Sequence, residues 1–161
     1  MDWRAKGALA LAAALGAGAA GAGEVDDAMG GQHWGMAATA ALSATYECAL
    51  KVGADDQKAM LDLAAAGTAY PDLTALPADG ASLRKLALSD PPAAEQERAK
   101  RDAQAAAEMV SRNKGASKRD ASYCRGMEQR VRAFMQRARS SGAMARAKDL
   151  MDASREAARP E

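Results

Sequence analysis

The sequence predicts an all-α protein, a small up-and-down bundle of four to five helices stapled by one disulfide. Apolar residues recur at alternating spacings of three and four, which places them on one side of a helix. No segment shows the apolar and polar alternation of a β-strand. The chain has only two cysteines, Cys48 and Cys124, far apart in the sequence. We therefore expect one helical domain over residues 33–158, closed by a single long-range bridge.

Residues 1–23 have the features of a cleaved signal peptide. Arg4 and Lys6 give a short basic start, an uncharged run follows from Gly7 to Gly23, and small residues precede the acidic stretch at Glu24. The run is rich in alanine and glycine and short for a bilayer-spanning helix, which favours cleavage over an uncleaved anchor. We expect a periplasmic or secreted protein with no transmembrane segment once the signal is removed.

The apolar core is thin. The chain has no isoleucine and a single phenylalanine, and alanine fills most apolar positions. In an oxidising compartment Cys48 and Cys124 would join, closing a loop of about 77 residues worth about 4–5 kcal/mol in the chain-entropy model. Since whole domains are stable by only about 5–15 kcal/mol, we expect a marginal fold that depends on this bridge.

The first helices follow a short leader. Residues 24–32 are rich in glycine and aspartate and are expected to be flexible. A helix is predicted from His33 to Val52, with one apolar stripe made of Trp34, Ala38, Ala41, Thr45, Cys48 and Val52. After Gly53, a shorter helix capped by Asp55 or Asp56 should run through Ala66 and end at Gly67.

Prolines divide the middle of the chain. The stretch from Thr68 to Ser82 contains two prolines and is expected to be a loop, pinned to the core by Leu73 and Leu76. A short helix carrying Leu83, Leu86 and Leu88 should follow. Asp90 and two prolines then start a further alanine-rich helix over residues 90–113.

The strongest predicted helix spans Ser117 to Ser141. Its apolar stripe consists of Cys124, Met127, Val131, Phe134 and Ala138. Gly142 should interrupt it, and a last helix carries Met144, Ala147, Leu150 and Met151. Each cysteine lies on the apolar stripe of its helix, one near a C-terminal end and the other near an N-terminal end. Bonding them requires these two helices to be antiparallel.

Charge is uneven along the chain, although the formal net charge is only +1. Residues 23–90 are acidic overall and residues 91–161 are basic. Five arginines of the strongest helix form a candidate partner-binding face, in which Arg125, Arg132 and Arg139 recur every seven residues with Arg130 and Arg137 alongside. An exported protein rarely meets nucleic acid, so we expect an envelope protein or an anionic envelope component as the partner. The alternative is that these arginines are a solvated face or lie against the acidic half.

The sequence offers little for catalysis. The single histidine, His33, lies among glycines near the expected mature N-terminus, where a nucleophile would be hard to hold against it. No hydrolase, zinc-protease, haem or phosphate-loop motif occurs. We therefore expect a non-enzymatic binding protein without a cofactor.

A metal site is the alternative function. Met29, His33 and Met36 have a four-three spacing that would place two thioethers and an imidazole on one side of a helix. Such soft ligands suit Cu(I) in an exported protein. Glycines interrupt this segment, however, and nine methionines in a chain without isoleucine are expected mainly as core filler.

Overall fold

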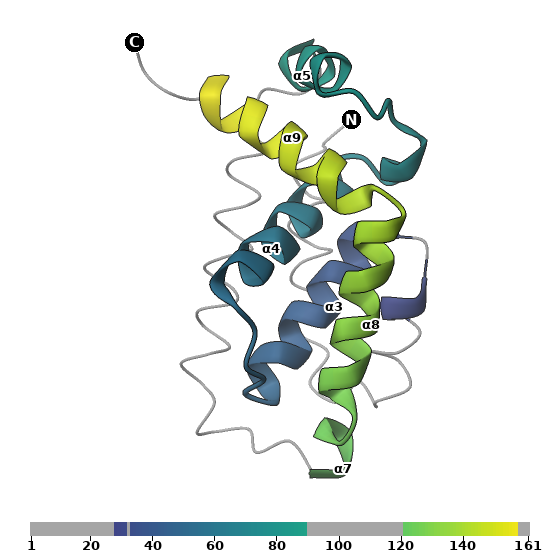
Figure 1. The fold of residues 1–161 in the computed structure, drawn as a ribbon, viewed down its shortest axis with the longest axis vertical. Helices are drawn as coiled ribbons and strands as arrows, with labels where there is room; N and C mark the ends of the chain where they lie inside the picture. Colours follow the sequence, from purple (N-terminus) through teal and green to yellow (C-terminus); the bar gives the residue numbers. More distant parts are fainter. Residues whose placement is uncertain (1–27, 32, 90–120, 158–161) are drawn as a thin grey trace, which may run out of the picture.

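The structure, a computed structural model, describes residues 28–31, 33–89 and 121–157 (Figure 1). Within these ranges there are helices and connecting turns but no strand, which confirms the predicted all-α class. The elements are α3 (Trp34–Glu47), α4 (Ala54–Ala69), the 3-10 turn η1 (Leu73–Ala75), α5 (Gly80–Ser89), α7 (Ala121–Cys124), α8 (Met127–Ser140) and α9 (Ala143–Ala157). The predicted signal peptide and the predicted helix over residues 90–113 lie outside the described residues.

Helices α3 and α4 form an antiparallel pair whose backbones come very close. Gly35 at the start of α3 faces Gly67 near the end of α4, and a Cβ added at Gly67 would lie 2.4 Å from the Gly35 nitrogen. At the opposite end of the pair, Gln57 donates a hydrogen bond to the Tyr46 hydroxyl. Seven of the buried residues of these two helices are alanines: Ala37, Ala38, Ala41, Ala44, Ala64, Ala65 and Ala66. Because the two helices approach closely, this part of the core is filled by small side chains.

Three predicted helix boundaries are wrong here. The first helix ends at Glu47, not Val52, because Ala49 has a φ of 51° and the Leu50 N–H bonds back to the Thr45 carbonyl. Helix α4 continues through Gly67 to Ala69. Its N-cap is Gly53, whereas the two aspartates proposed as caps stand in the first turn, where carboxylates complement the helix dipole.

The connection from α4 to α5 is fixed to the core at several points. Leu73 in η1 is fully buried and Leu76 is partly buried, as predicted. The Arg146 side chain donates a hydrogen bond of 2.9 Å to the Leu76 carbonyl. Helix α5 starts three residues earlier than expected, and Asp79 accepts a 2.8 Å hydrogen bond from the Ser82 N–H just inside it. This loop is therefore held by backbone hydrogen bonds as well as by apolar contacts.

The predicted long helix from Ser117 to Ser141 is broken within the described residues. Gly126 adopts a φ of 77°, a left-handed conformation that glycine accepts easily, and separates α7 from α8. The predicted apolar stripe is otherwise confirmed in α8, where Met127, Val131, Phe134 and Ala138 are buried.

The predicted disulfide joins Cys48 to Cys124 with the two Cα atoms 5.4 Å apart. At the other end of the same two helices, the rings of Trp34 and Phe134 lie 6.4 Å apart. The start of α3 thus meets the later part of α8, while the bridge joins the end of α3 to the residues before α8. The two helices are antiparallel, as the positions of the cysteines required.

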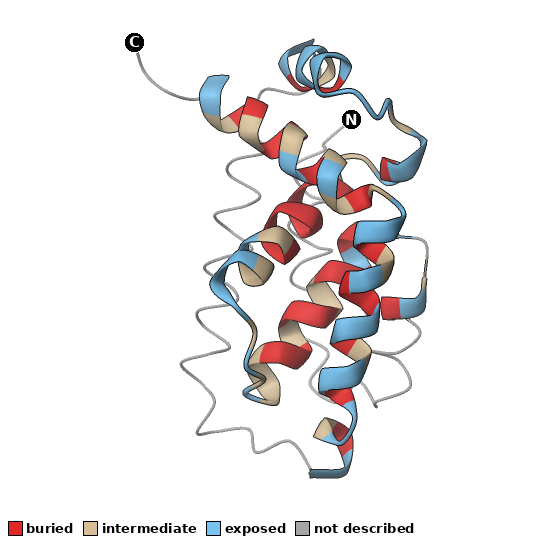
Figure 2. Ribbon diagram, viewed as in Figure 1, coloured by how far each residue is buried: buried red, intermediate tan, exposed pale blue. Residues whose placement is uncertain are grey.

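Helix α9 closes one end of the bundle. Gly142 has a φ of 77° and turns the chain sharply after α8. Figure 1 shows α9 crossing the end of the α3, α4 and α8 group, with α5 on its far side. Ala147, Leu150 and Met151 of this helix are fully buried. Figure 2 shows the buried residues concentrated where α3, α4, α8 and α9 face one another.

Residues 28–31 differ from the expected flexible leader. Residues 28–30 form a helical turn, and the Met29 side chain is buried in the core with 4% of its surface exposed. The turn lies beside Arg137 of α8, which bonds to its carbonyls. Across the described ranges, no helix combines the length and the apolar character that crossing a bilayer would require.

Candidate functional site

The candidate site is the solvent-facing side of α8. Four polar residues follow one another there at spacings of four and three, and all four are exposed: Gln129, Arg132, Gln136 and Arg139. The opposite side of the helix is the buried apolar stripe. Arg125 is also exposed, immediately before the break at Gly126. We call these five residues the arginine face. Because of the break, the seven-residue spacing does not by itself fix the direction of Arg125 relative to the other two arginines.

Two arginines of this face pair with exposed carboxylates. Arg132 contacts Glu128 one turn earlier at 2.5 Å, and Arg139 contacts Asp56 of α4. The side chains of the first pair are 76% and 54% exposed, and those of the second are 52% and 46% exposed. Exposed pairs of this kind contribute only about 0–1 kcal/mol. These guanidinium groups can therefore exchange their carboxylates for those of a partner at little cost.

Arg137 has a different role from the exposed arginines. Its guanidinium lies 4.7 Å from the centroid of the Trp34 ring and 5.8 Å from that of Phe134. It donates hydrogen bonds to the carbonyls of Met29, Gly30 and Gly31, the last at 2.9 Å. A cation at the carbonyl end of a helical turn is favoured by the helix dipole, and the ring faces add cation–π attraction. This arginine holds residues 29–31 against the bundle.

The structure therefore divides the five arginines predicted to bind a partner. Arg125, Arg132 and Arg139 are exposed, whereas Arg130 is half-buried and has an interaction of its own. Arg137 is half-buried and committed to the fold. Helical periodicity separated the exposed arginines from the apolar stripe, but nothing in the local sequence distinguished Arg137 from them.

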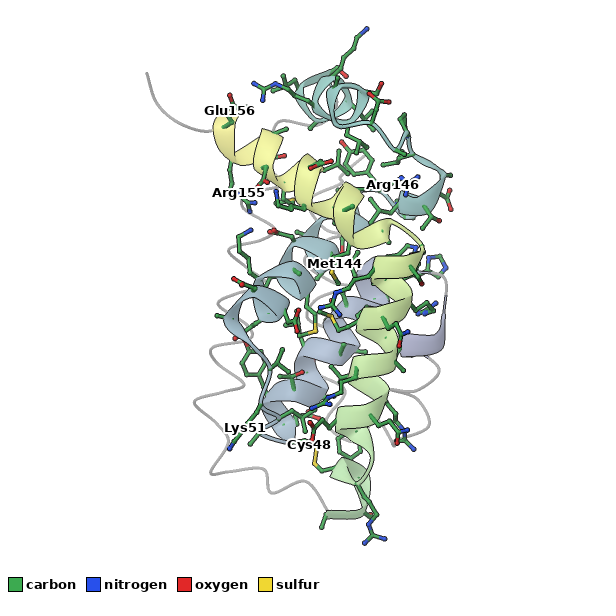
Figure 3. All side chains as sticks on the ribbon, in the orientation of Figure 1. Cys48, Lys51, Met144, Arg146, Arg155 and Glu156 are labelled. Atoms are coloured by element: carbon green, nitrogen blue, oxygen red, sulfur yellow. A yellow bond between two sulfur atoms is a disulfide. The ribbon has the colours of Figure 1, made fainter. Side chains whose placement is uncertain are left out.

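A second group of charges, which local sequence patterns do not predict, joins α4 to α9. Asp62 is almost completely buried, and its carboxylate accepts hydrogen bonds from Lys58 at 2.9 Å and from Arg155 at 3.0 Å. Arg155 also contacts Asp152, which receives a 2.7 Å hydrogen bond from Lys148. Figure 3 shows Arg155 on the side of α9 that faces α4. Each charged group of the cluster has an oppositely charged partner within it, which identifies the cluster as a structural tie between the two helices.

The electrostatics of this cluster are visible at Asp152. Burial raises the pKa of its carboxyl group, but hydrogen bonds from Lys148 and Arg155 lower it more, and the resulting pKa is about 2. For Arg155, burial lowers the pKa, while hydrogen bonds to Asp62 and Asp152 raise it, and the net shift is upward. Asp152 and Arg155 are therefore stabilised in their charged forms at neutral pH.

The residues of the proposed metal site lie in different environments. The Met29 side chain is buried in the core, whereas His33 and Met36 are exposed on the first turn of α3. His33 is the N-cap residue, although its side chain makes no capping hydrogen bond. In the described ranges, no group of three or more histidine, cysteine, aspartate or glutamate side chains is placed to hold a metal ion.

Comparison with known protein families, with curated proteins and with solved structures found no match. The fold and the arrangement of side chains are thus the basis for any functional proposal.

Proposed function

We propose that this chain is an exported, non-catalytic binding protein whose arginine face contacts an anionic component of the cell envelope. The leader sequence supports export, and the bridge between Cys48 and Cys124 suits an oxidising compartment. The bundle serves as a rigid support, with α8 fixed on one side by its apolar stripe and displaying arginines on the other.

One observation carries the proposal. The exposed arginines Arg132 and Arg139 pair with exposed carboxylates, and Arg125 is exposed just before the start of α8. Guanidinium groups recognise carboxylates and phosphates through two parallel hydrogen bonds, which lysine cannot reproduce. Exchange of a weak internal partner for an external anion is therefore the chemistry that this surface supports best.

Co-purification from the native envelope tests the binding surface. The Arg125→Glu, Arg132→Glu variant is compared with a matched control, Lys51→Glu, Lys85→Glu, in which two exposed basic residues elsewhere are reversed. We expect the first variant to lose partners that the control retains. An identical set of partners for wild type and both variants would remove the arginine face from consideration.

Intact-mass measurement on protein from its own host tests export. We expect a chain that lacks about 23 residues and is 2 Da lighter than its reduced form because of the disulfide. A retained leader or two free thiols would contradict the proposed localisation.

A further inference from the structure

The arginine face lacks the features of a surface that binds another protein. Apart from Ala133, the exposed side chains of α8 are polar or charged. The exposed large hydrophobic residues within the described ranges are Met36 and Leu88, on α3 and α5. Protein interfaces are usually stabilised by buried aromatic and apolar anchors surrounded by a polar rim. The arginine face would supply the rim without the anchors.

Magnitudes also disfavour a protein partner. An ion pair that stays hydrated at the rim of an interface strengthens binding by about fivefold at most, so three arginines without apolar anchors around them would contribute about 150-fold. Fixing two proteins in one orientation weakens association by at least about 1,000-fold. A bilayer differs, because it presents many equivalent headgroups at high local concentration and does not require the protein to be fixed in one orientation.

We infer that the arginine face binds anionic phospholipid headgroups at a bilayer surface, an inference that rests on the function proposed above. Each arginine close to an anionic bilayer strengthens binding by about fivefold. The segment Ala121–Ser140 contains one glutamate and five arginines, of which Arg125, Arg132 and Arg139 are exposed. Glu128 and Asp56 contact Arg132 and Arg139 and oppose binding, whereas acidic residues more than about 8 Å from the surface are largely screened at physiological salt. Arg132 and Arg139 exchange Glu128 and Asp56 for phosphates, while the apolar stripe keeps α8 on the bundle.

Co-sedimentation with vesicles tests this inference on the protein purified from its native host. Binding is measured to vesicles with about 30% phosphatidylglycerol in phosphatidylcholine and to pure phosphatidylcholine, at roughly 0.05 M and 0.3 M NaCl. We expect binding to the anionic vesicles alone and a marked loss at the higher salt. Arg125→Gln, Arg132→Gln, Arg139→Gln should weaken binding about 10- to 100-fold.

The matched control neutralises three exposed basic residues elsewhere, Lys51→Gln, Arg84→Gln and Lys85→Gln, and should bind within about twofold of wild type. Circular dichroism verifies that both variants fold. Equal binding of wild type and the arginine variant would overturn the inference. Salt-insensitive binding to both vesicle types would also overturn the inference, because a retained apolar leader would produce such binding without the arginines.

Failure of the lipid inference and failure of the proposed function give different results. If no vesicle binds but co-purification still depends on the arginines, the partner is an acidic protein or polymer and the lipid inference is wrong. If neither assay responds to the arginines, both proposals are wrong.

Discussion

Replacing Gly67 by alanine tests the backbone-to-backbone packing of α3 against α4. The added Cβ would lie 2.4 Å from the Gly35 nitrogen and 2.9 Å from its Cα. These are backbone atoms of a helix, so they cannot rotate away as a side chain would. Alanine gains about 1 kcal/mol over glycine in helix propensity. Overpacking usually costs about 1–3 kcal/mol and sometimes more, and two rigid contacts this short place Gly67 above that range. We expect a net loss of about 2 kcal/mol in the free energy of unfolding.

Denaturant and thermal unfolding followed by circular dichroism measure this loss. For a domain of this size, about 2 kcal/mol lowers the melting temperature by roughly 7 °C. Gly53→Ala is the control, because a Cβ at the N-cap of α4 would meet nothing within 4 Å. Alanine is a poorer N-cap than glycine by up to about 1 kcal/mol, but it lowers the conformational entropy of the unfolded chain by about 0.4–1 kcal/mol, so the net effect should be small. If Gly67→Ala unfolds at the same denaturant concentration as wild type, the two helices do not meet at their glycines and the reasoning fails.

Three further predictions concern covalent and electrostatic ties. Replacing Cys48 and Cys124 by serine should cost about 4–5 kcal/mol, since the bridge closes a loop of about 77 residues; denaturant titration of the double variant checks this, and an unchanged midpoint would contradict it. Asp62→Ala removes the buried acceptor shared by Lys58 and Arg155 and should cost about 1–3 kcal/mol, since Arg155 keeps Asp152 and Lys58 is exposed; an unchanged unfolding midpoint would show that α9 does not depend on this cluster. The pKa of Asp152 is lower in the folded protein, about 2, than its ordinary value of 3.8. Its contribution to stability is therefore complete above about pH 4 and is lost as the pH falls towards 2. Because solvent screens this half-exposed carboxylate, we expect it to contribute about 1 kcal/mol to the free energy of unfolding. Unfolding measured at pH 2 and at pH 5 should show this difference in wild type but not in Asp152→Asn.

Glycines show why periodicity predicts helices better than their ends. Gly67 lies inside α4 and allows contact with α3, whereas Gly126 and Gly142 adopt left-handed conformations that break the chain direction. The local sequence does not separate these roles, because glycine both weakens a helix and permits close packing. The stop predicted at Gly142 was confirmed. The stop at Gly67 and the continuous helix across Gly126 were wrong.

The charged residues show a second limit of sequence reasoning. Seven-residue spacing correctly placed Arg132 and Arg139 on the exposed side of α8, because a helix fixes which residues share a face. Asp62 lies between two leucines at buried positions, which was the only local hint of its burial. Its partner Arg155 is 93 residues away, and only the packing of α9 on α4 brings them together. Long-range ion pairs of this kind depend on tertiary geometry that local patterns do not contain.

Arginines on one helix can thus be separated into structural and binding roles by what surrounds them. Arg137 donates hydrogen bonds to three backbone carbonyls and lies over two aromatic rings. Its removal would leave these partly buried carbonyls without the hydrogen bonds of the guanidinium. Removal of Arg132 breaks one exposed pair and leaves Glu128 in water. Neutralising Arg125, Arg132 and Arg139 while keeping Arg137 should therefore change what the surface binds without changing how the bundle folds. This separation allows a loss of binding to be attributed to the surface itself.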